Sequence, residues 1–174
     1  MKILSSVLII LTAFTVTFSQ NLYDSNTYTD LRYDFSITGI DAWSMEYLTN
    51  NYRVIFYPAD KINEVYVAVT AYISSEITSA GVVQQIRAGT NWDRMKILGL
   101  KKGDDKITAL YENSEIDEDQ NLQNQYVAED IYVKDYYKVY VVTAVAKGED
   151  WLLYKDKLRE IMKSFYIGRK GYYE

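Results

Sequence analysis

Two residue types that dominate enzyme chemistry are missing from this chain. Its 174 residues include no cysteine and no histidine. Without cysteine the chain has no disulfides, no thiolate nucleophiles and no cysteine-based zinc sites. Without histidine it lacks the commonest general base and metal ligand, and it cannot build a Ser-His-Asp or Cys-His site alone. Most hydrolase mechanisms are therefore excluded before any motif is considered.

The chain also carries little positive charge and little proline. Its 19 Lys and Arg residues are outnumbered by 24 Asp and Glu residues, which gives a formal net charge of -5. Because an acidic surface repels phosphate backbones, we expect no nucleic-acid partner. Proline occurs once, whereas tyrosine occurs 18 times. The abundance of tyrosine fits either the codon bias of an AT-rich genome, helped by the strand propensity of this residue, or an aromatic binding surface.

The first residues are typical of a secretory signal peptide. Lys2 precedes an apolar run over residues 3–18, and Thr17 and Ser19 provide the small side chains that signal peptidase accepts. The alternative is an uncleaved membrane anchor, but the run is shorter than the roughly 20 residues that a spanning helix needs. We therefore predict removal of residues 1–19 and a periplasmic or secreted protein, with membrane contact only through this segment.

The remaining chain is predicted to hold one folded domain. Residues 20–32 are polar and lack periodicity, which predicts a flexible leader. The domain is predicted over residues 33–167, and residues 168–174 are predicted to be a frayed tail. A domain of this size buries roughly 70% of its unfolded surface, so it can be stable without disulfides.

Short runs rich in β-branched and aromatic residues predict several strands. They lie at residues 33–37, 53–57, 64–73, 96–100, 107–111, 125–133 and 137–145. In the clearest run, EVYVAVTAYI, Val65, Val67 and Val69 alternate with other residues and therefore share one face. The acidic residues 112–123 are predicted to be a loop. Strands that follow one another without helices between them predict antiparallel pairing.

Two helices are expected to flank the sheet. The first is predicted over residues 76–94, where apolar residues recur at helical spacing. The second begins near Glu149 and Asp150, two acids that the positive end of a helix dipole favours. Its apolar stripe, which we predict packs on the sheet, consists of Trp151, Tyr154, Leu158, Ile161 and Phe165. The predicted fold class is therefore α+β, an antiparallel β-sheet flanked by helices.

The last predicted hairpin, residues 125–133 and 137–145, has two different faces. Alternation places the apolar residues on one side, namely Val127, Ile131, Val133, Val139, Val141 and Val145. The other side carries Tyr126, Asp130, Tyr132, Lys138 and Tyr140. Aromatics beside charges are typical of contact surfaces, so we predict that these five residues contact another envelope protein or a glycan. The alternative is that helices or the leader cover this face and the tyrosines belong to the core.

Other motifs point to no metal, cofactor or catalytic residue. The stretch ENSEIDED, which starts at Glu112, lacks the order of ligands that an EF-hand calcium loop requires. The stretch GLKKG, which starts at Gly99, lacks the Ser or Thr that follows the lysine of a phosphate-binding loop, and a hairpin turn explains it. We therefore predict no cofactor and assign no catalytic residue.

Three features of the chain resemble one known family. They are YDFSITGIDAW from residue 33, the strand pair RVIFYPAD and EVYVAVTAY, and the C-terminal stretch YYKVYVVTAVAKGEDWLLYKDKLREIMKSF. Together they resemble the PsbP-like superfamily, which includes the photosystem protein PsbP, a nuclear Ran-release factor and DcrB-like bacterial envelope proteins. The resemblance covers residues 33–167 and departs from the family at Ile40 and Asp41, where a proline is usual.

This resemblance implies a three-layer α-β-α sandwich with an antiparallel sheet. Members of the family are mostly non-catalytic binding or assembly proteins, and no functional residue carries over because no functional motif matches. We therefore expect a non-catalytic exported binding or assembly module of the cell envelope. The alternatives are an extracytoplasmic enzyme that uses carboxylates or tyrosines, and a structural subunit of an envelope complex. A cleft with convergent buried acids would favour the enzyme.

Overall fold

The structure is a computed structural model that describes residues 26–47, 52–61, 64–88, 95–116, 122–134 and 137–168. The predicted signal peptide at residues 1–19 lies outside the described residues. Within these ranges, no helix is long and apolar enough to span a membrane.

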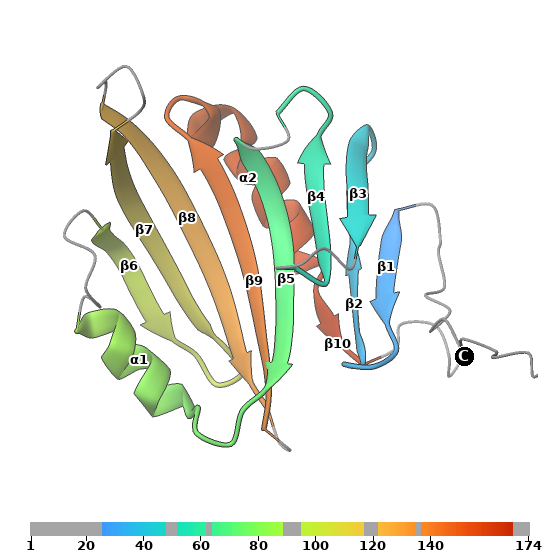
Figure 1. Ribbon diagram of the computed structural model, residues 1–174, viewed down its shortest axis with the longest axis vertical. Helices are drawn as coiled ribbons and strands as arrows, with labels where there is room; N and C mark the ends of the chain where they lie inside the picture. The colour runs from blue at the N-terminus through green and yellow to red at the C-terminus, as the bar shows by residue number, and fades with distance from the viewer. Residues whose placement is uncertain are drawn as a thin grey trace, which may run out of the picture.

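The largest unit of the described chain is one seven-stranded antiparallel sheet (Figure 1). Its strands lie side by side in the order β3 (Trp43–Tyr47), β4 (Val54–Pro58), β5 (Val65–Ile73), β9 (Lys138–Lys147), β8 (Leu122–Val133), β7 (Ile107–Ile116) and β6 (Met95–Lys102). A three-stranded sheet has the order β1 (Thr27–Asp30), β2 (Phe35–Thr38) and β10 (Tyr166–Ile167). The helices are α1 (Ser79–Arg87) and α2 (Asp150–Lys163). The predicted fold class, α+β with an antiparallel sheet, is confirmed.

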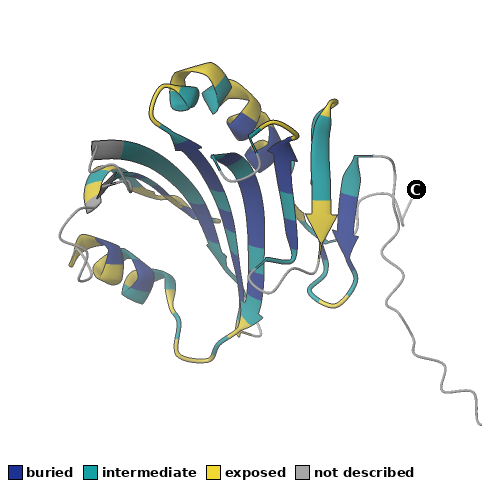
Figure 2. Cartoon of the chain, turned by 45° about the horizontal axis from the view of Figure 1, so that its top comes forward, coloured by how far each residue is buried: buried dark blue, intermediate teal, exposed yellow. Residues whose placement is uncertain are grey.

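The helices lie on opposite sides of the large sheet (Figure 2). The small sheet packs together with α2 against one face, and α1 covers part of the other face. The core is accordingly divided into two clusters, one on each side of the large sheet. This is the α-β-α layering that the sequence resemblance implied.

The core under α2 is built from the stripe predicted on that helix. Leu158 and Ile161 are fully buried, and Phe165 is buried just after the helix. The Phe165 ring lies 5.0 Å from the Tyr132 ring and 5.4 Å from the Phe35 ring, measured between centroids. The predicted packing of the stripe on the sheet is therefore confirmed.

The core under α1 is smaller. Val82 and Ile86 are buried against residues of β7, β8 and β9. The Thr78 hydroxyl accepts a hydrogen bond from the Gly81 N–H at 3.1 Å, and this cap fixes the start of the helix. The helix therefore begins after the predicted start at residue 76. Residues 89–94, the end of the predicted helix, lie outside the described residues.

The folded part begins earlier than the sequence predicted. Thr27–Asp30, within the predicted leader at residues 20–32, form β1 and pair with β2. Tyr28 and Asp30 are buried. The Asp30 carboxylate lies 2.7 Å from the Arg53 guanidinium and accepts a hydrogen bond from the Tyr28 hydroxyl at 3.0 Å. This ion pair compensates the charge of Asp30, so a polar segment can lie in the interior. The hydrophobic pattern of the sequence does not reveal such a pairing.

The two ends of the folded part are joined through the small sheet. β10 follows α2 and pairs with β2. The Ser164 hydroxyl accepts a hydrogen bond of 2.8 Å from the Thr38 N–H, across 126 residues of sequence. Gly168, the first residue of the predicted tail, donates its N–H to the Asp34 carbonyl at 2.7 Å. The rest of that tail lies outside the described residues.

The acidic stretch predicted as a loop at residues 112–123 is mostly strand. β7 continues to Ile116, β8 begins at Leu122, and these two residues lie opposite each other. Backbone pairing between two neighbouring strands needs no apolar side chains, so the ladder extends past the hydrophobic part of the sequence. The two strands consequently reach well beyond the nine-residue helix α1.

Candidate functional site

The β8–β9 hairpin has the two faces that alternation predicted. The register pairs Val127 with Val145 and Tyr132 with Tyr140, so the valines and the tyrosines point to opposite sides of the sheet. The side that carries Val127 and Ile131 faces α1, whereas the tyrosine side faces α2.

The five residues predicted as a contact surface do not form one exposed surface. Tyr140 is 1% exposed and Asp130 is 5% exposed. The Tyr140 hydroxyl donates to the Tyr33 carbonyl at 2.6 Å, and Asp130 accepts from the Thr108 hydroxyl at 2.8 Å and pairs with Lys106. Burial and nearby acids raise the pKa of Tyr140 to about 12, so this phenol stays neutral at ordinary pH. Their predicted exposure is corrected, because alternation separates the two faces of a hairpin but does not show which face a helix will cover.

The other three predicted contact residues, Tyr126, Tyr132 and Lys138, are partly buried. The Tyr126 ring stacks on Trp151 with centroids 5.6 Å apart, and the Tyr132 ring packs on Phe165. Most of this face is therefore the second layer of the core, which was the alternative interpretation. Whether its partly exposed rim also touches a partner stays a prediction.

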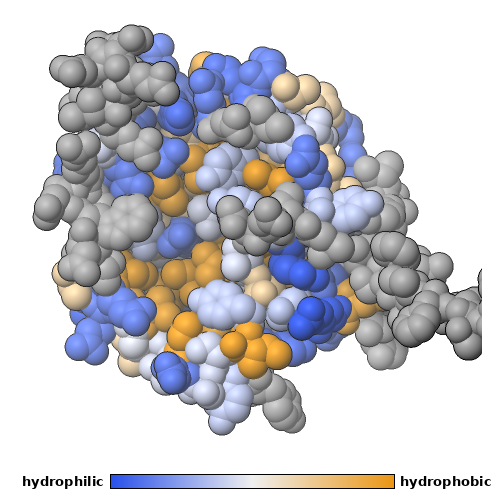
Figure 3. Space-filling view, in the orientation of Figure 1, coloured by the Kyte–Doolittle hydropathy of each residue, from blue (hydrophilic) through white to orange (hydrophobic). Residues whose placement is uncertain are grey.

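The opposite face of the hairpin carries a stronger candidate, a cavity of about 430 Å³ between α1 and the large sheet. Its walls are mainly apolar, and Figure 3 shows apolar side chains gathered on this side of the molecule. The lining residues are Tyr72, Ile77, Val82, Gln85, Ile86, Tyr111, Asn113, Val127, Glu129, Ile131 and Val141. We refer to this space as the α1 cavity.

The α1 cavity follows from a difference in length between the helix and the strands. Helix α1 has nine residues, whereas β8 has 12. A helix of that length rises about 14 Å and a strand of that length extends about 40 Å. The helix can therefore cover only part of the face, and the uncovered floor between them is lined by side chains that alternation directs toward α1.

Glu129 lies on the floor of the α1 cavity, between Val127 and Ile131 on the same face of β8. The Tyr111 and Thr143 hydroxyls lie beside its carboxylate and act on its pKa as hydrogen-bond donors. Burial raises the pKa of Glu129, and those two hydrogen bonds oppose the rise. The site thus holds a desolvated carboxyl group whose charge is only partly compensated by neutral donors.

Two tyrosines beside Glu129 stay in their neutral form. Burial raises the pKa of Tyr111 strongly, and the charge of Glu129 adds to that rise. Burial, followed by the Glu129 charge, raises the pKa of Tyr72 as well. These phenols can therefore donate hydrogen bonds or offer a ring face, but they do not supply a phenolate base near neutral pH.

Asn113 contributes an unpaired acceptor to the same cavity. Its Oδ1 atom is buried and has no hydrogen-bond partner among the described residues. A buried acceptor without a partner costs about 1–3 kcal/mol, so such atoms are rare unless they serve a purpose. Asn113 lies opposite Gln125 on β8, four residues from Glu129, which places the two acceptors about 13 Å apart along the strands.

A second cavity, of about 690 Å³, lies at the start of α2 and is a weaker candidate. Its central cation, Lys61, is already paired with Glu64 at 3.1 Å and with Asp150 at 3.2 Å. Trp151, also in its wall, stacks on Tyr126. Because Lys61, Asp150 and Trp151 already have partners within the chain, this cavity is the weaker candidate.

Sequence reasoning missed the residues of the α1 cavity, although one signal was present. Glu129 interrupts the apolar face predicted from Val127, Ile131 and Val133, and a charged residue at an inward position is unusual. Tyr111 and Asn113 gave no comparable signal, because only the register of β7 against β8 brings them to this cavity.

Comparison with known proteins identifies the architecture. No known protein family and no curated protein sequence matches the chain. The solution structure of cyanobacterial PsbP (CyanoP) from Synechocystis sp. PCC 6803 is similar, with a TM-score of 0.52 and 11% identity over 81% of this chain and 91% of that chain. The chain has a PsbP-like fold. The crystal structure of LpqN, involved in cell envelope biogenesis of Mycobacterium tuberculosis, is also similar, with a TM-score of 0.52 and 13% identity over 78% of this chain and 83% of that chain.

The PsbP-like fold confirms the resemblance seen in the sequence. At identities of 11% and 13%, the likeness shows the fold alone. The chemistry of the α1 cavity must therefore be argued from this chain's own residues, because one fold supports many functions.

Proposed function

We propose that this PsbP-like protein is an exported, non-catalytic binding module of the cell envelope, and that the α1 cavity is its ligand site. The observation that carries the proposal is a pair of acceptors, the partly buried Glu129 carboxylate and the buried Asn113 Oδ1 atom, in a cavity that is otherwise mainly apolar. Small-molecule sites usually have roughly 300–1,000 Å³ and apolar walls with a few polar groups that fix orientation. The α1 cavity, at about 430 Å³, has this character.

The composition of the cavity favours binding over catalysis. Glu129 is the single carboxylic acid among the described lining residues, so there is no second acid to form the pair that glycoside hydrolysis uses. Tyr72 and Tyr111 have raised pKa values and do not act as bases near neutral pH. A Glu129-dependent enzyme is the second candidate, because a partly buried carboxyl group with a raised pKa also suits general acid catalysis.

Two observations support an envelope location. The segment at residues 1–19 has the pattern of a secretory signal. One of the similar structures, LpqN, is described as involved in cell envelope biogenesis.

The test is to recover the ligand from the protein as it exists in its own cell. Protein isolated from the envelope or medium would be analysed by native mass spectrometry, alongside a Val141→Phe variant that fills the α1 cavity. A Leu153→Phe variant is the control, since Leu153 is 73% exposed and lies outside the cavity lining. We expect a small molecule to accompany wild type and the control but not Val141→Phe.

Two results would contradict the proposal. Equal ligand content in all three proteins would place the site elsewhere. Conversion of the recovered ligand during incubation with wild type, but not with a Glu129→Gln variant, would establish the enzyme instead.

A further inference from the structure

The polar atoms of the α1 cavity point to one class of ligand. We propose, resting on the function proposed above, that this cavity binds an amphipathic amine whose ammonium group sits at Glu129 and whose apolar body lies along the floor of β7 and β8. The Glu129 carboxylate has no cation among the described lining residues, Asn113 Oδ1 has no hydrogen-bond partner there, and both groups are acceptors. They therefore select a ligand that donates hydrogen bonds.

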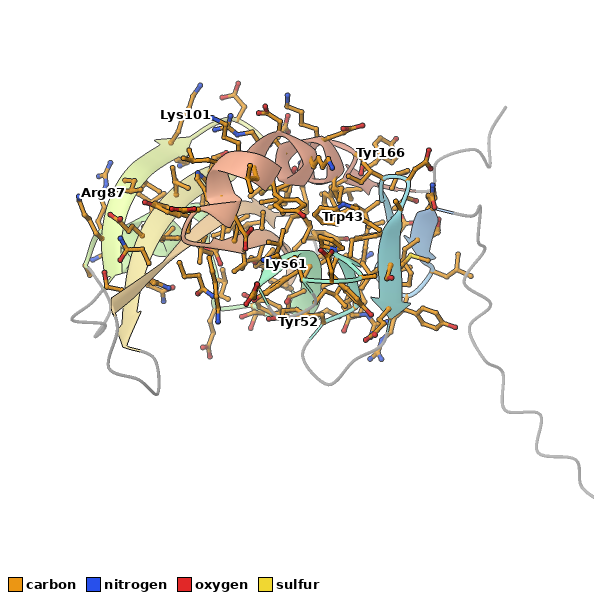
Figure 4. The ribbon with its side chains drawn as sticks, turned by 90° about the horizontal axis from the view of Figure 1, so that it is seen from above. Trp43, Tyr52, Lys61, Arg87, Lys101 and Tyr166 are labelled. Carbon is orange, nitrogen blue, oxygen red and sulfur yellow. The ribbon has the colours of Figure 1, made fainter. Side chains whose placement is uncertain are left out.

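Among the described residues that line the α1 cavity, none near Glu129 carries a positive charge. The polar groups that face it are Tyr72 from β5, Tyr111 from β7 and Thr143 from β9, with Gln85 contributed to the lining by α1. No lysine or arginine is among the described lining residues. Arg87, at the end of α1, is exposed at the outer edge of the molecule (Figure 4) and does not line the cavity.

A ligand ammonium would supply the missing counter-charge. Partial burial of a carboxylate carries a desolvation cost that pairing with a cation offsets, and the two Glu129 oxygens can accept more hydrogen bonds than the neighbouring Tyr111 and Thr143 hydroxyls can donate. The rings of Tyr72 and Tyr111 also line this space, and aromatic faces attract cations within about 6 Å. Charge, hydrogen bonding and ring chemistry therefore favour the same head group.

The remaining lining sets the shape of the ligand. Val127 and the Tyr111 ring lie between Glu129 and Asn113 along the strands, which provides an apolar path about 13 Å long. Asn113 Oδ1 can accept a hydrogen bond from a second donor at the far end of the ligand. We expect an elongated ligand with an aliphatic or aromatic spacer rather than a compact polar one.

Other ligand classes fit less well. The charge of Glu129 would repel a carboxylate or phosphate, and no cation in the lining offsets it. A metal ion would need more oxygen ligands than this site offers, and no group of three or more acidic side chains is found within the described ranges.

Three probes of equal chain length test the head group. Octylamine, octan-1-ol and octanoate would each be titrated into the full exported protein, with binding followed by backbone amide NMR shifts and by calorimetry. The proteins compared would be wild type, Glu129→Gln and Glu160→Gln, the last being the same change at an exposed position of α2. Shifts confined to residues of α1, β7 and β8 would locate the probe.

We expect wild type and Glu160→Gln to bind octylamine at least tenfold more tightly than octan-1-ol, and to bind octanoate most weakly. In Glu129→Gln the preference for the amine should disappear while octan-1-ol binding is retained, which also shows that the variant is folded. A preference for the amine that survives in Glu129→Gln, equal binding of amine and alcohol in wild type, or no binding of any probe would overturn the assignment of an amine. A different result would contradict the proposed function itself: the Val141→Phe protein, whose cavity is filled, would keep its native ligand.

Discussion

Replacing Asn113 with leucine is expected to stabilise the protein while weakening its site. The Asn113 Oδ1 atom is buried and has no partner among the described residues, so the wild-type protein bears the cost of an unpaired acceptor. That cost is about 1–3 kcal/mol, and leucine removes it while adding apolar surface to an apolar cavity. We therefore expect the free energy of unfolding to rise by about 1–2 kcal/mol, which for a domain of this size raises Tm by about 2–4 °C for each kcal/mol.

Asn124 provides a matched control for this change. It lies on the same hairpin, but its side chain donates to Glu112 at 3.1 Å and accepts from the Ser114 hydroxyl at 3.2 Å. Asn124→Leu should therefore lower the free energy of unfolding by about 1–2 kcal/mol, because both partners lose a hydrogen bond. Urea unfolding and thermal melts of both variants measure the difference.

The reasoning is refuted if Asn113→Leu destabilises the protein as much as Asn124→Leu does. The native ligand supplies a second readout. Because Asn113 is expected to bind one end of the ligand, Asn113→Leu should release ligand more readily even though the empty protein is more stable.

The remaining predictions concern charge, packing and processing. Burial raises the pKa of Glu129 above its value of about 4.3 in the unfolded chain, so the folded state holds this proton more tightly. The free energy of unfolding therefore falls as pH rises from the unfolded pKa through the folded pKa. Glu129→Gln should be more stable than wild type at pH 7, with the difference closing below about pH 4, whereas Glu160→Gln should follow wild type. Leu158→Ala should cost about 2–5 kcal/mol in urea unfolding, against less than about 0.5 kcal/mol for the exposed Leu153→Ala on the same helix, and similar values would argue against the buried stripe. Intact-mass analysis of the exported protein should show a chain that begins at residue 20, and full-length protein in the membrane fraction would contradict cleavage.

Local patterns in the sequence predicted much of the fold. Alternation in β5 and in the β8–β9 hairpin assigned side chains to the correct faces, because a strand repeats every two residues whatever surrounds it. Helical spacing likewise identified the stripe of Leu158, Ile161 and Phe165. These features depend on neighbours within a few residues.

Features that depend on distant partners could not be predicted. The sequence of β1 is polar and therefore predicts a leader. Its place in the fold depends on Arg53, which pairs with Asp30. The tyrosine face looked like a contact surface because nothing in the hairpin itself shows that α2 covers it. The α1 cavity depends on the shortness of the helix and on the register of β7 against β8. Neither feature can be predicted from a single stretch of sequence.

The bond between Ser164 and Thr38 has a consequence for the timing of folding. The two residues are 126 positions apart, so the small sheet cannot close until almost the whole domain is available. Contacts over such long loops form slowly, because the chain entropy lost on closure precedes the stabilisation gained. During synthesis, Phe35 and Ile37 on β2 would lack their packing against α2 until the last helix emerges. The small sheet is therefore the part of the domain that is completed last as the chain is made.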